Sequence, residues 1–208
     1  MPVAPEYRTT GTPPPLHYID GLMHHLGHPY YVGYLSAARL HGASYQVPMV
    51  LQVVTPALLR DRRIGGSRLQ FIRRSATATR PTQPVNIDTG RVTVSTPATT
   101  ALDIVDAPEF SGGLGNVATV IGDLLVGQRL ADDELAAAAA SYPTAVVQRA
   151  GFVLSFMANE VGEALKLDRL ERRVDRADYV ALDPHQAMSG IRDRTWRVDI
   201  NSEIEHDL

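Results

Sequence analysis

The stretch from residue 30 to residue 55 constrains the fold most, because it passes from a helix to a buried strand through one short turn. Three apolar residues are spaced for one side of a helix: Leu35, Ala38 and Leu40. Gly42 follows them and can supply the left-handed conformation that commonly ends a helix. Residues 49–54 then form a valine-rich run of strand length. We therefore expect a helix that leads into a buried strand, as the nucleus of a sheet domain.

Part of this stretch matches the motif of a known family. The matching residues are Tyr31, Gly33, Ser36, Ala37, Ala38, His41 and Gly42, in the pattern Y-x-G-x-x-S-A-A-x-x-H-G. This pattern resembles the helix that precedes the first strand in AbiEi-type antitoxins of type IV toxin–antitoxin systems. Near the end of the chain, Trp196 and Asn201 resemble a closing element of the same proteins, so that the resemblance covers roughly residues 5–201. The motif identifies a family and is no catalytic signature.

The resemblance implies a partner and a domain organisation. It implies an antitoxin paired with a nucleotidyltransferase-like toxin of the AbiEii kind. In relatives with an N-terminal winged helix it also implies repression of the operon through operator DNA. Such proteins carry a phrase similar to residues 5–8 where the winged helix ends, so we expect that domain to be missing or to lie upstream. Residues 1–15 are interpreted as a linker or a remnant of that domain, and residues 16–208 as the antitoxin domain.

The composition excludes several classes of protein. Cysteine is absent, which excludes a disulfide framework and a thiolate metal site. No run reaches the roughly 18 apolar residues of a membrane span, and the N-terminus has no signal pattern. We therefore expect a cytoplasmic protein with no membrane contact.

Apolar periodicity predicts the remaining elements. A helix is expected over residues 16–27, a strand over residues 67–74, and a hairpin from residues 85–87 and 92–94. From residue 96 the chain is helical, with short strands at its end; the predicted helices begin near residues 96, 115, 132, 144 and 167, and the strands lie at 179–182 and 195–200. The predicted class is α/β (α+β): a mixed, partly antiparallel sheet in the N-terminal half packs with a helical C-terminal half.

Basic residues are concentrated in one part of the chain. Residues 56–94 hold eight Arg against two Asp, a net charge of +6, whereas residues 95–208 hold ten basic and nineteen acidic residues, a net charge of −9. The predicted phosphate- or DNA-binding residues are Arg60, Arg62, Arg63, Arg68, Arg73, Arg74 and Arg80. An acidic partner protein would recognise the same surface. The structural alternative is a solvated strand edge on which arginine prevents pairing with other chains.

Two further clusters have structural interpretations. Glycines at residues 112–115 precede a helix, but they lack the Lys-Ser/Thr of a phosphate-binding P-loop, and we interpret them as a helix–helix turn. Three histidines lie close together: His24, His25 and His28. Gly27 breaks the helix between them, and we predict no metal site. His41 is expected to pack against or cap its helix end.

The family resemblance also admits an enzyme. Type IV pairs are described as neutralising the toxin without a stable complex, which a covalent modification would explain. The chemically simplest version is an atypical serine/threonine protein kinase that phosphorylates the toxin with ATP and Mg²⁺. Its candidate catalytic residues are Lys166, Asp199 and Asn201. No kinase signature is present, and the alternative is a salt-bridged surface strand beside a buried Trp196. The binding interpretation needs no cofactor.

Overall fold

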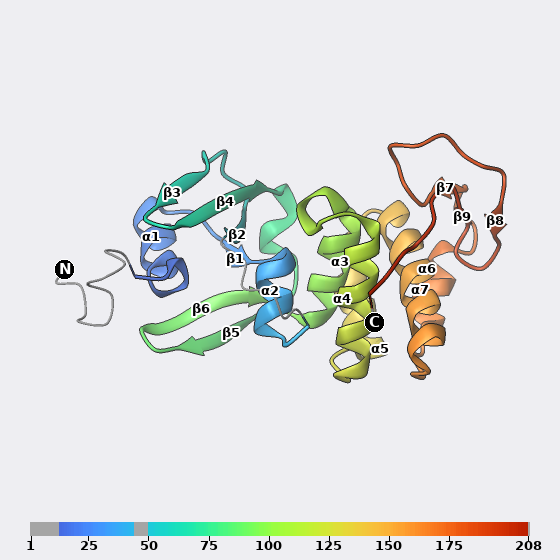
Figure 1. Ribbon diagram of the computed structural model, residues 1–208, viewed down its shortest axis with the longest axis horizontal. Coiled ribbons are helices and arrows are strands. Elements are labelled where there is room, and N and C mark those ends of the chain that lie inside the picture. Colours follow the sequence, from blue (N-terminus) through green and yellow to red (C-terminus); the bar gives the residue numbers. More distant parts are fainter. Residues whose placement is uncertain (1–12, 44–49, 208) are drawn as a thin grey trace.

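The molecule has a sheet half and a helical half that follow each other along its long axis (Figure 1). It is described by a computed structural model that covers residues 13–43 and 50–207. The sheet half contains six strands: β1 Tyr31–Val32, β2 Val50–Thr55, β3 Arg62–Ile64, β4 Ser67–Arg73, β5 Thr82–Ile87 and β6 Gly90–Ser95. Their order in the sheet is β3-β4-β2-β1-β6-β5, with β2–β4 and β1–β6 parallel and the other pairs antiparallel. The predicted α+β class with a mixed sheet is therefore confirmed.

Helices cover the sheet and form the second half. The short 3₁₀ helices are η2 Pro15–His17, η3 Ser75–Ala78 and η4 Pro108–Ser111. The α-helices are α1 Ile19–Leu26, α2 Tyr34–Leu40, α3 Pro97–Asp106, α4 Leu114–Val126, α5 Asp132–Ala139, α6 Thr144–Val161 and α7 Asp168–Val174. A small second sheet, of order β7-β9-β8, lies beyond them: β7 Val180–Ala181, β8 Arg192–Asp193 and β9 Val198–Asp199.

The expected nucleus is present as α2 followed by β2, although residues 44–49 between them lie outside the described residues. Gly42 has a φ of +79°, as the predicted helix end requires. The hairpin is also confirmed, because Ile87 pairs with Gly90 around a two-residue turn. Thr96 caps α3 by accepting a hydrogen bond from the Thr99 amide at 3.2 Å.

Some boundaries differ from the sequence prediction. The sheet has six strands, and the sequence prediction missed β1 and β3, because they have two and three residues, too few for a periodic pattern. The predicted helix over residues 16–27 is a 3₁₀ turn followed by α1. The helix predicted to begin near residue 144 ends at Val161, well before the next predicted helix near residue 167, because Gly162 takes a φ of +70°.

The core has two parts on opposite faces of the sheet. The smaller part lies under α1 and includes Ile19, Met23, Val53 and Leu69. The larger part surrounds α3, which is buried at every position from Ala98 to Val105. Since successive strand residues face opposite sides, Val53 and Val54 of β2 belong to different parts. The sheet therefore holds α1 on one side and the helical half on the other.

The C-terminal segment closes the helical half. Trp196 is 2% exposed and lies over Gly151 of α6, where any side chain would overlap the indole ring. Trp196 Nε1 also donates a hydrogen bond to Ser155 Oγ at 2.9 Å. The chain then returns along α4, where the Asp207 amide donates to Thr119 Oγ1 at 3.1 Å. None of the helices in the described part of the chain is long and apolar enough to cross a bilayer.

Candidate interaction surfaces

The outer hairpin of the six-stranded sheet, β3 and β4 with the residues before it, carries most of the predicted phosphate-binding arginines. Within the described residues strand β3 pairs only with β4, so that its other side is an open edge. Five arginines on and around these two strands are exposed, and we call this surface the arginine edge: Arg60, Arg62, Arg63, Arg68 and Arg73. Between residues 60 and 73 these five face a single acid, Asp61, which gives a net charge of +4.

The register of the hairpin distributes these arginines over both faces of the sheet. Arg63 lies opposite Arg68, on the same face. Arg62 lies opposite Leu69, which packs under α1, so Arg62 projects from the other face. Arg73 is on the Leu69 face, because it lies four residues further along β4. The positive charge therefore surrounds the edge and does not form a one-sided patch.

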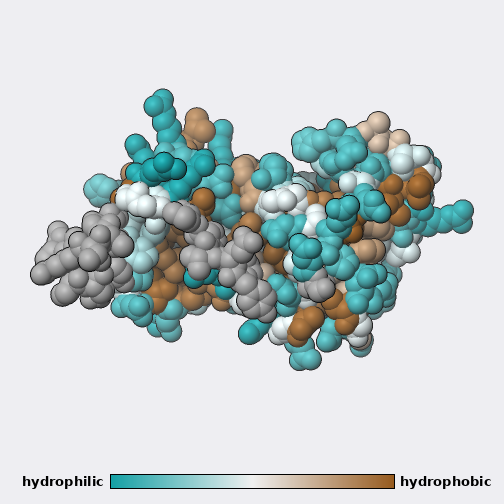
Figure 2. Space-filling model, viewed as in Figure 1, coloured by the Kyte–Doolittle hydropathy of each residue, from teal (hydrophilic) through white to brown (hydrophobic). Residues whose placement is uncertain are grey.

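Few groups of the protein itself neutralise the arginine edge. Asp61 binds Arg68 at 2.6 Å and accepts the Phe71 amide at 3.0 Å. Arg73 Nε donates to the Pro56 carbonyl at 3.3 Å. Within the described part of the chain, the side chains of Arg60, Arg62 and Arg63 have no hydrogen-bond or ion-pair partner. Figure 2 shows the hydrophilic side chains that project above β3 and β4 at this end of the molecule.

The prediction that grouped Arg80 with the surface arginines needs correction, because Arg80 is buried. Its side chain is 4% exposed and pairs with the carboxylate of Asp103, which is fully buried. Arg80 Nη1 also donates to the Tyr31 hydroxyl at 3.1 Å, and its guanidinium lies 4.1 Å from the centre of the Tyr142 ring. These partners leave Arg80 unable to reach a phosphate on a partner molecule.

Asp103 is the centre of this buried network. It accepts hydrogen bonds from the hydroxyls of Tyr142 at 2.7 Å and Tyr31 at 3.0 Å. Burial raises the pKa of the Asp103 carboxyl above its usual value, although the positive charge of Arg80 and the two hydroxyls oppose the rise. A buried charge of this kind persists because its partners replace the lost water.

Arg74 joins the rim of the network through Asp106. Arg74 Nε lies 3.3 Å from Asp106 Oδ2, and Arg80 Nη2 lies 3.6 Å from the same oxygen. We call the complete cluster the seam: Tyr31, Arg74, Arg80, Asp103, Asp106 and Tyr142. Its members come from β1, the segments that flank η3, α3 and the α5–α6 turn. The seam therefore connects the sheet half to the helical half.

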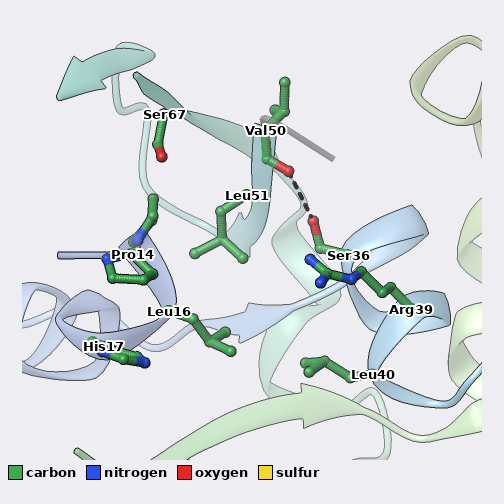
Figure 3. Close-up of a pocket in the computed structure, with 10 residues that line it drawn as sticks. Pro14, Leu16, His17, Ser36, Arg39, Leu40, Val50, Leu51 and Ser67 are labelled. Atoms are coloured by element: carbon green, nitrogen blue, oxygen red, sulfur yellow. Dashed lines mark hydrogen bonds between the residues drawn. The ribbon is translucent and has the colours of Figure 1, made fainter. Parts of the chain in front are cut away.

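A groove on the sheet half lies between η2, α2 and β2 (Figure 3). Its wall is mostly apolar and includes Pro14, Leu16, Leu40 and Leu51. One end is closed by Ser36, whose hydroxyl donates to the Val50 carbonyl at 3.2 Å. No pair of catalytic acid and base groups meets among these lining residues.

Of the three candidate kinase residues, Asp199 and Asn201 support one and the same loop. Asp199 accepts hydrogen bonds from the Ser189 and Gly190 amides at 2.6 and 2.9 Å. Desolvation by burial raises the pKa of the Asp199 carboxyl, but these hydrogen-bond donors lower it more, so that the pKa lies below its usual value. In the described part of the chain, exposed Lys166 has no hydrogen bond or ion pair with Asp199 or Asn201.

Asn201 supports the same loop as Asp199. Its side chain accepts the Asp183 amide at 2.9 Å and donates to the Asp183 carbonyl at 2.9 Å and the Gln186 carbonyl at 3.1 Å. Asp199 and Asn201 therefore hold the loop between β7 and β8, and their polar atoms are engaged there.

The glycine and histidine clusters have the surroundings of structural elements. Gly112 and Gly113 connect η4 to α4 with φ angles of +77° and +92°, as a helix–helix turn requires. His24, His25 and His28 are exposed at the end of α1. Over residues 13–43 and 50–207, no three His, Cys, Asp or Glu side chains are grouped to hold a metal ion.

Comparison with known proteins identifies the family. The family model described as the AbiEi antitoxin C-terminal domain matches residues 31–156, which is more than half of the chain. The chain belongs to the AbiEi antitoxin family. Membership supports an antitoxin role in a toxin–antitoxin system, with a toxin as the partner.

A solved structure has the same fold as this AbiEi domain. It is the RV2827C protein from Mycobacterium tuberculosis, with a TM-score of 0.61 and 14% sequence identity. The similarity covers 90% of this chain and 68% of that chain. At this identity the comparison shows the likeness of fold alone. A search of curated proteins found no significant match.

The AbiEi motif has structural roles in this chain. Tyr31 binds Asp103 in the seam, and a side chain on Gly33 would lie 2.9 Å from atoms of Tyr31 and Val54. Ser36 Oγ accepts the Gln52 amide at 2.9 Å, which fixes α2 on β2. The ring nitrogen Nε2 of His41 lies 2.8 Å from the Ser95 carbonyl, as expected for a residue at the helix end. The motif residues therefore fix the position of α2 against the sheet.

Sequence reasoning missed the partners that complete these contacts. Asp103 lies in a helical pattern and Tyr142 in the turn between two helices, and nothing in the sequence indicates a buried charge there. Gln52 is buried in β2, where it accepts the Leu35 amide at 3.0 Å and donates to Gln70 and the Phe110 carbonyl. A polar residue inside an apolar strand is the one signal that could have identified Gln52 as a buried hydrogen-bonding residue.

Proposed function

We propose that this chain is the antitoxin of a type IV toxin–antitoxin pair and neutralises a nucleotidyltransferase-like toxin of the AbiEii kind. The family match over residues 31–156 carries this proposal. The motif residues Tyr31, Gly33 and Ser36 support it, because their contacts give the domain its helix–strand nucleus. The exposed surfaces of the domain are then available to a partner.

We further propose that the arginine edge binds the phosphate backbone of operator DNA, so that the antitoxin regulates its own operon. The guanidinium group of an arginine can donate two parallel hydrogen bonds to two oxygens of one phosphate. The edge offers three guanidiniums that have no partner among the described residues, Arg60, Arg62 and Arg63, and two more at Arg68 and Arg73. Since these contacts involve the backbone, we expect weak binding that depends strongly on salt and little on base sequence.

The antitoxin role is tested by co-expression with the cognate toxin. Cells that express the toxin alone should stop growing, and cells that also express this chain should grow. The comparison variant is Arg80→Met, which removes the buried ion pair. It should lower the level of folded protein and therefore the growth of cells that express the toxin. Growth arrest despite abundant folded wild-type chain would contradict an antitoxin role.

The mode of neutralisation is tested on the purified toxin. Toxin incubated with this chain, ATP and Mg²⁺ should keep its intact mass and should bind the chain, without the need for a complex stable enough to co-elute. A gain of one phosphate that requires the chain would contradict neutralisation by binding and support the modifying enzyme.

A further inference from the structure

A second basic surface lies on the helical half, at the end of the molecule opposite the arginine edge (Figure 1). It is a groove of about 850 Å³ between α7, the start of α6 and the turn after β8. Its polar lining on the basic side consists of Thr144, Arg172, Arg173, Arg176, Arg194 and Thr195. Two acids, Glu171 and Asp175, also line it, so that four Arg and two acids give a net charge of +2.

The charges of α7 are divided between two sides of the helix. Leu170 and Val174 are buried and define the inner side. At about 100° per residue, and with the turn after α7 included, Arg172 points outward. Arg173 and Arg176 fall to one side of it, and Glu171 and Asp175 fall to the other. The guanidinium of Arg173 binds the carbonyls of Ala139 and Tyr142, the latter at 2.6 Å. The basic side of α7 therefore faces the α5–α6 turn, next to Thr144.

The arginines of this groove are not neutralised by nearby acids. Within the described residues, the side chains of Arg172, Arg176 and Arg194 have no hydrogen bond or ion pair. Asp193 is engaged by the Trp196 amide at 2.7 Å, and Asp199 by the loop amides of Ser189 and Gly190. Asp193 and Asp199 thus hold loops together. Glu171 and Asp175, the two acids of the groove, form no ion pair with these three guanidiniums within the described residues, so that the guanidiniums remain available for a ligand.

The donors of the groove match a phosphate better than a carboxylate. Guanidiniums from two separate elements and the hydroxyls of Thr144 and Thr195 can converge on one anion. The start of α6 has no side-chain cap, which adds a partial positive charge to the same region. A carboxylate has two oxygens to accept these donors, whereas a phosphate ester offers three or more. We propose that this groove binds a phosphate-bearing ligand through Arg172, Arg176 and Arg194.

The test is titration calorimetry of the full chain with inorganic tripolyphosphate. Arg172→Gln, Arg176→Gln and Arg194→Gln combined should weaken binding at least about tenfold, since each removes a charged donor. The matched control is Arg62→Gln, Arg63→Gln and Arg73→Gln combined, which removes the same charge from the arginine edge and should change binding less than about threefold. Unfolding in urea checks that both variants fold, and Arg194→Gln alone replaces the triple variant if it does not.

Two further probes define the ligand. Citrate carries a similar charge on carboxylates and should bind more weakly than tripolyphosphate. If ATP binds with the same affinity as tripolyphosphate, the groove recognises the phosphate chain alone. If ATP binds more tightly, the groove also contacts the nucleoside. Both results support a phosphate site. The proposal is overturned if wild type binds no probe, if citrate binds equally well, or if the two triple variants lose affinity equally. None of these outcomes depends on DNA or toxin binding.

Discussion

The seam and the arginine edge use the same residue type in opposite ways. Both draw on the seven predicted arginines between residues 60 and 80. On the edge, Arg62 and Arg63 are exposed on a strand that has a neighbour on one side only. In the seam, Arg80 is almost fully buried between Asp103 and the Tyr142 ring. An arginine-rich run is therefore not evidence for one surface, because the fold decides which guanidiniums remain available.

The difference follows from the position of each arginine relative to the helical half. The β3–β4 hairpin lies at the outer end of the sheet, where little of the chain can cover it. Arg80 lies between η3 and β5, where α3 and the α5–α6 turn approach the sheet. A charge in that position is retained only with an opposite charge and hydrogen bonds.

The largest expected effect is the loss of the buried ion pair. Arg80→Met should lower the free energy of unfolding by about 3–5 kcal/mol, because it leaves the Asp103 carboxylate buried without a positive partner. Arg62→Met on the edge should change it by less than about 0.5 kcal/mol. Urea denaturation measures both. Equal losses would contradict the division between seam and edge, and Arg80→Lys serves as a milder variant if Arg80→Met does not fold.

A smaller effect is expected from overpacking the seam. Gly33→Ala should cost about 1–3 kcal/mol, because the new methyl would lie 2.9 Å from Tyr31 Cε2 and Val54 Cγ2. Gly66→Ala is the matched change in the β3–β4 turn, where nothing lies within 4 Å and φ is not left-handed. It should be neutral or stabilise by up to about 1 kcal/mol. Thermal or urea unfolding that ranks the two variants in reverse would refute the close packing at Gly33.

The smallest expected effect is a pH dependence at His41. Burial lowers the pKa of His41 below its usual 6.5, although its bond to Ser95 opposes the shift. Below pH 6.5 the unfolded chain therefore binds a proton that the folded chain does not, and stability from this residue falls as pH decreases. His41→Gln keeps a donor for Ser95 and cannot titrate. The difference in unfolding free energy between wild type and His41→Gln should shrink from pH 7.5 to 5.5; a constant difference would contradict this.

Much of the fold was predictable from the sequence. Gly42 and Thr96 act through their own backbone neighbours, so that their roles as helix end and helix cap could be inferred locally. Strand β3 could not be inferred, because its three residues are all exposed and its only signal is pairing with β4.

The candidate surfaces were predictable only in part. The density of arginine in the sequence grouped the five residues of the edge, which the structure places together at the surface. The burial of Arg80 was not predictable, since its partner Asp103 lies on a helix that follows the intervening hairpin. Tyr142 is further still along the chain, and contacts of this range leave no local pattern. The groove at α7 could not be predicted from the sequence, because its residues come from α7 and from the turn after β8, whose relative positions only the structure shows.

The salt dependence of DNA binding tests the central claim most directly. Fluorescence anisotropy with a labelled operator fragment gives the slope of log affinity against log salt. Each phosphate contact contributes about −0.9 to this slope. Combined Arg62→Gln, Arg63→Gln and Arg73→Gln should make the slope smaller in magnitude by about 2 to 3 and weaken binding, while unfolding in urea stays unchanged. The variant Arg172→Gln, Arg176→Gln and Arg194→Gln should keep most of the slope. An unchanged slope in the edge variant would contradict the assignment of DNA contact to the arginine edge.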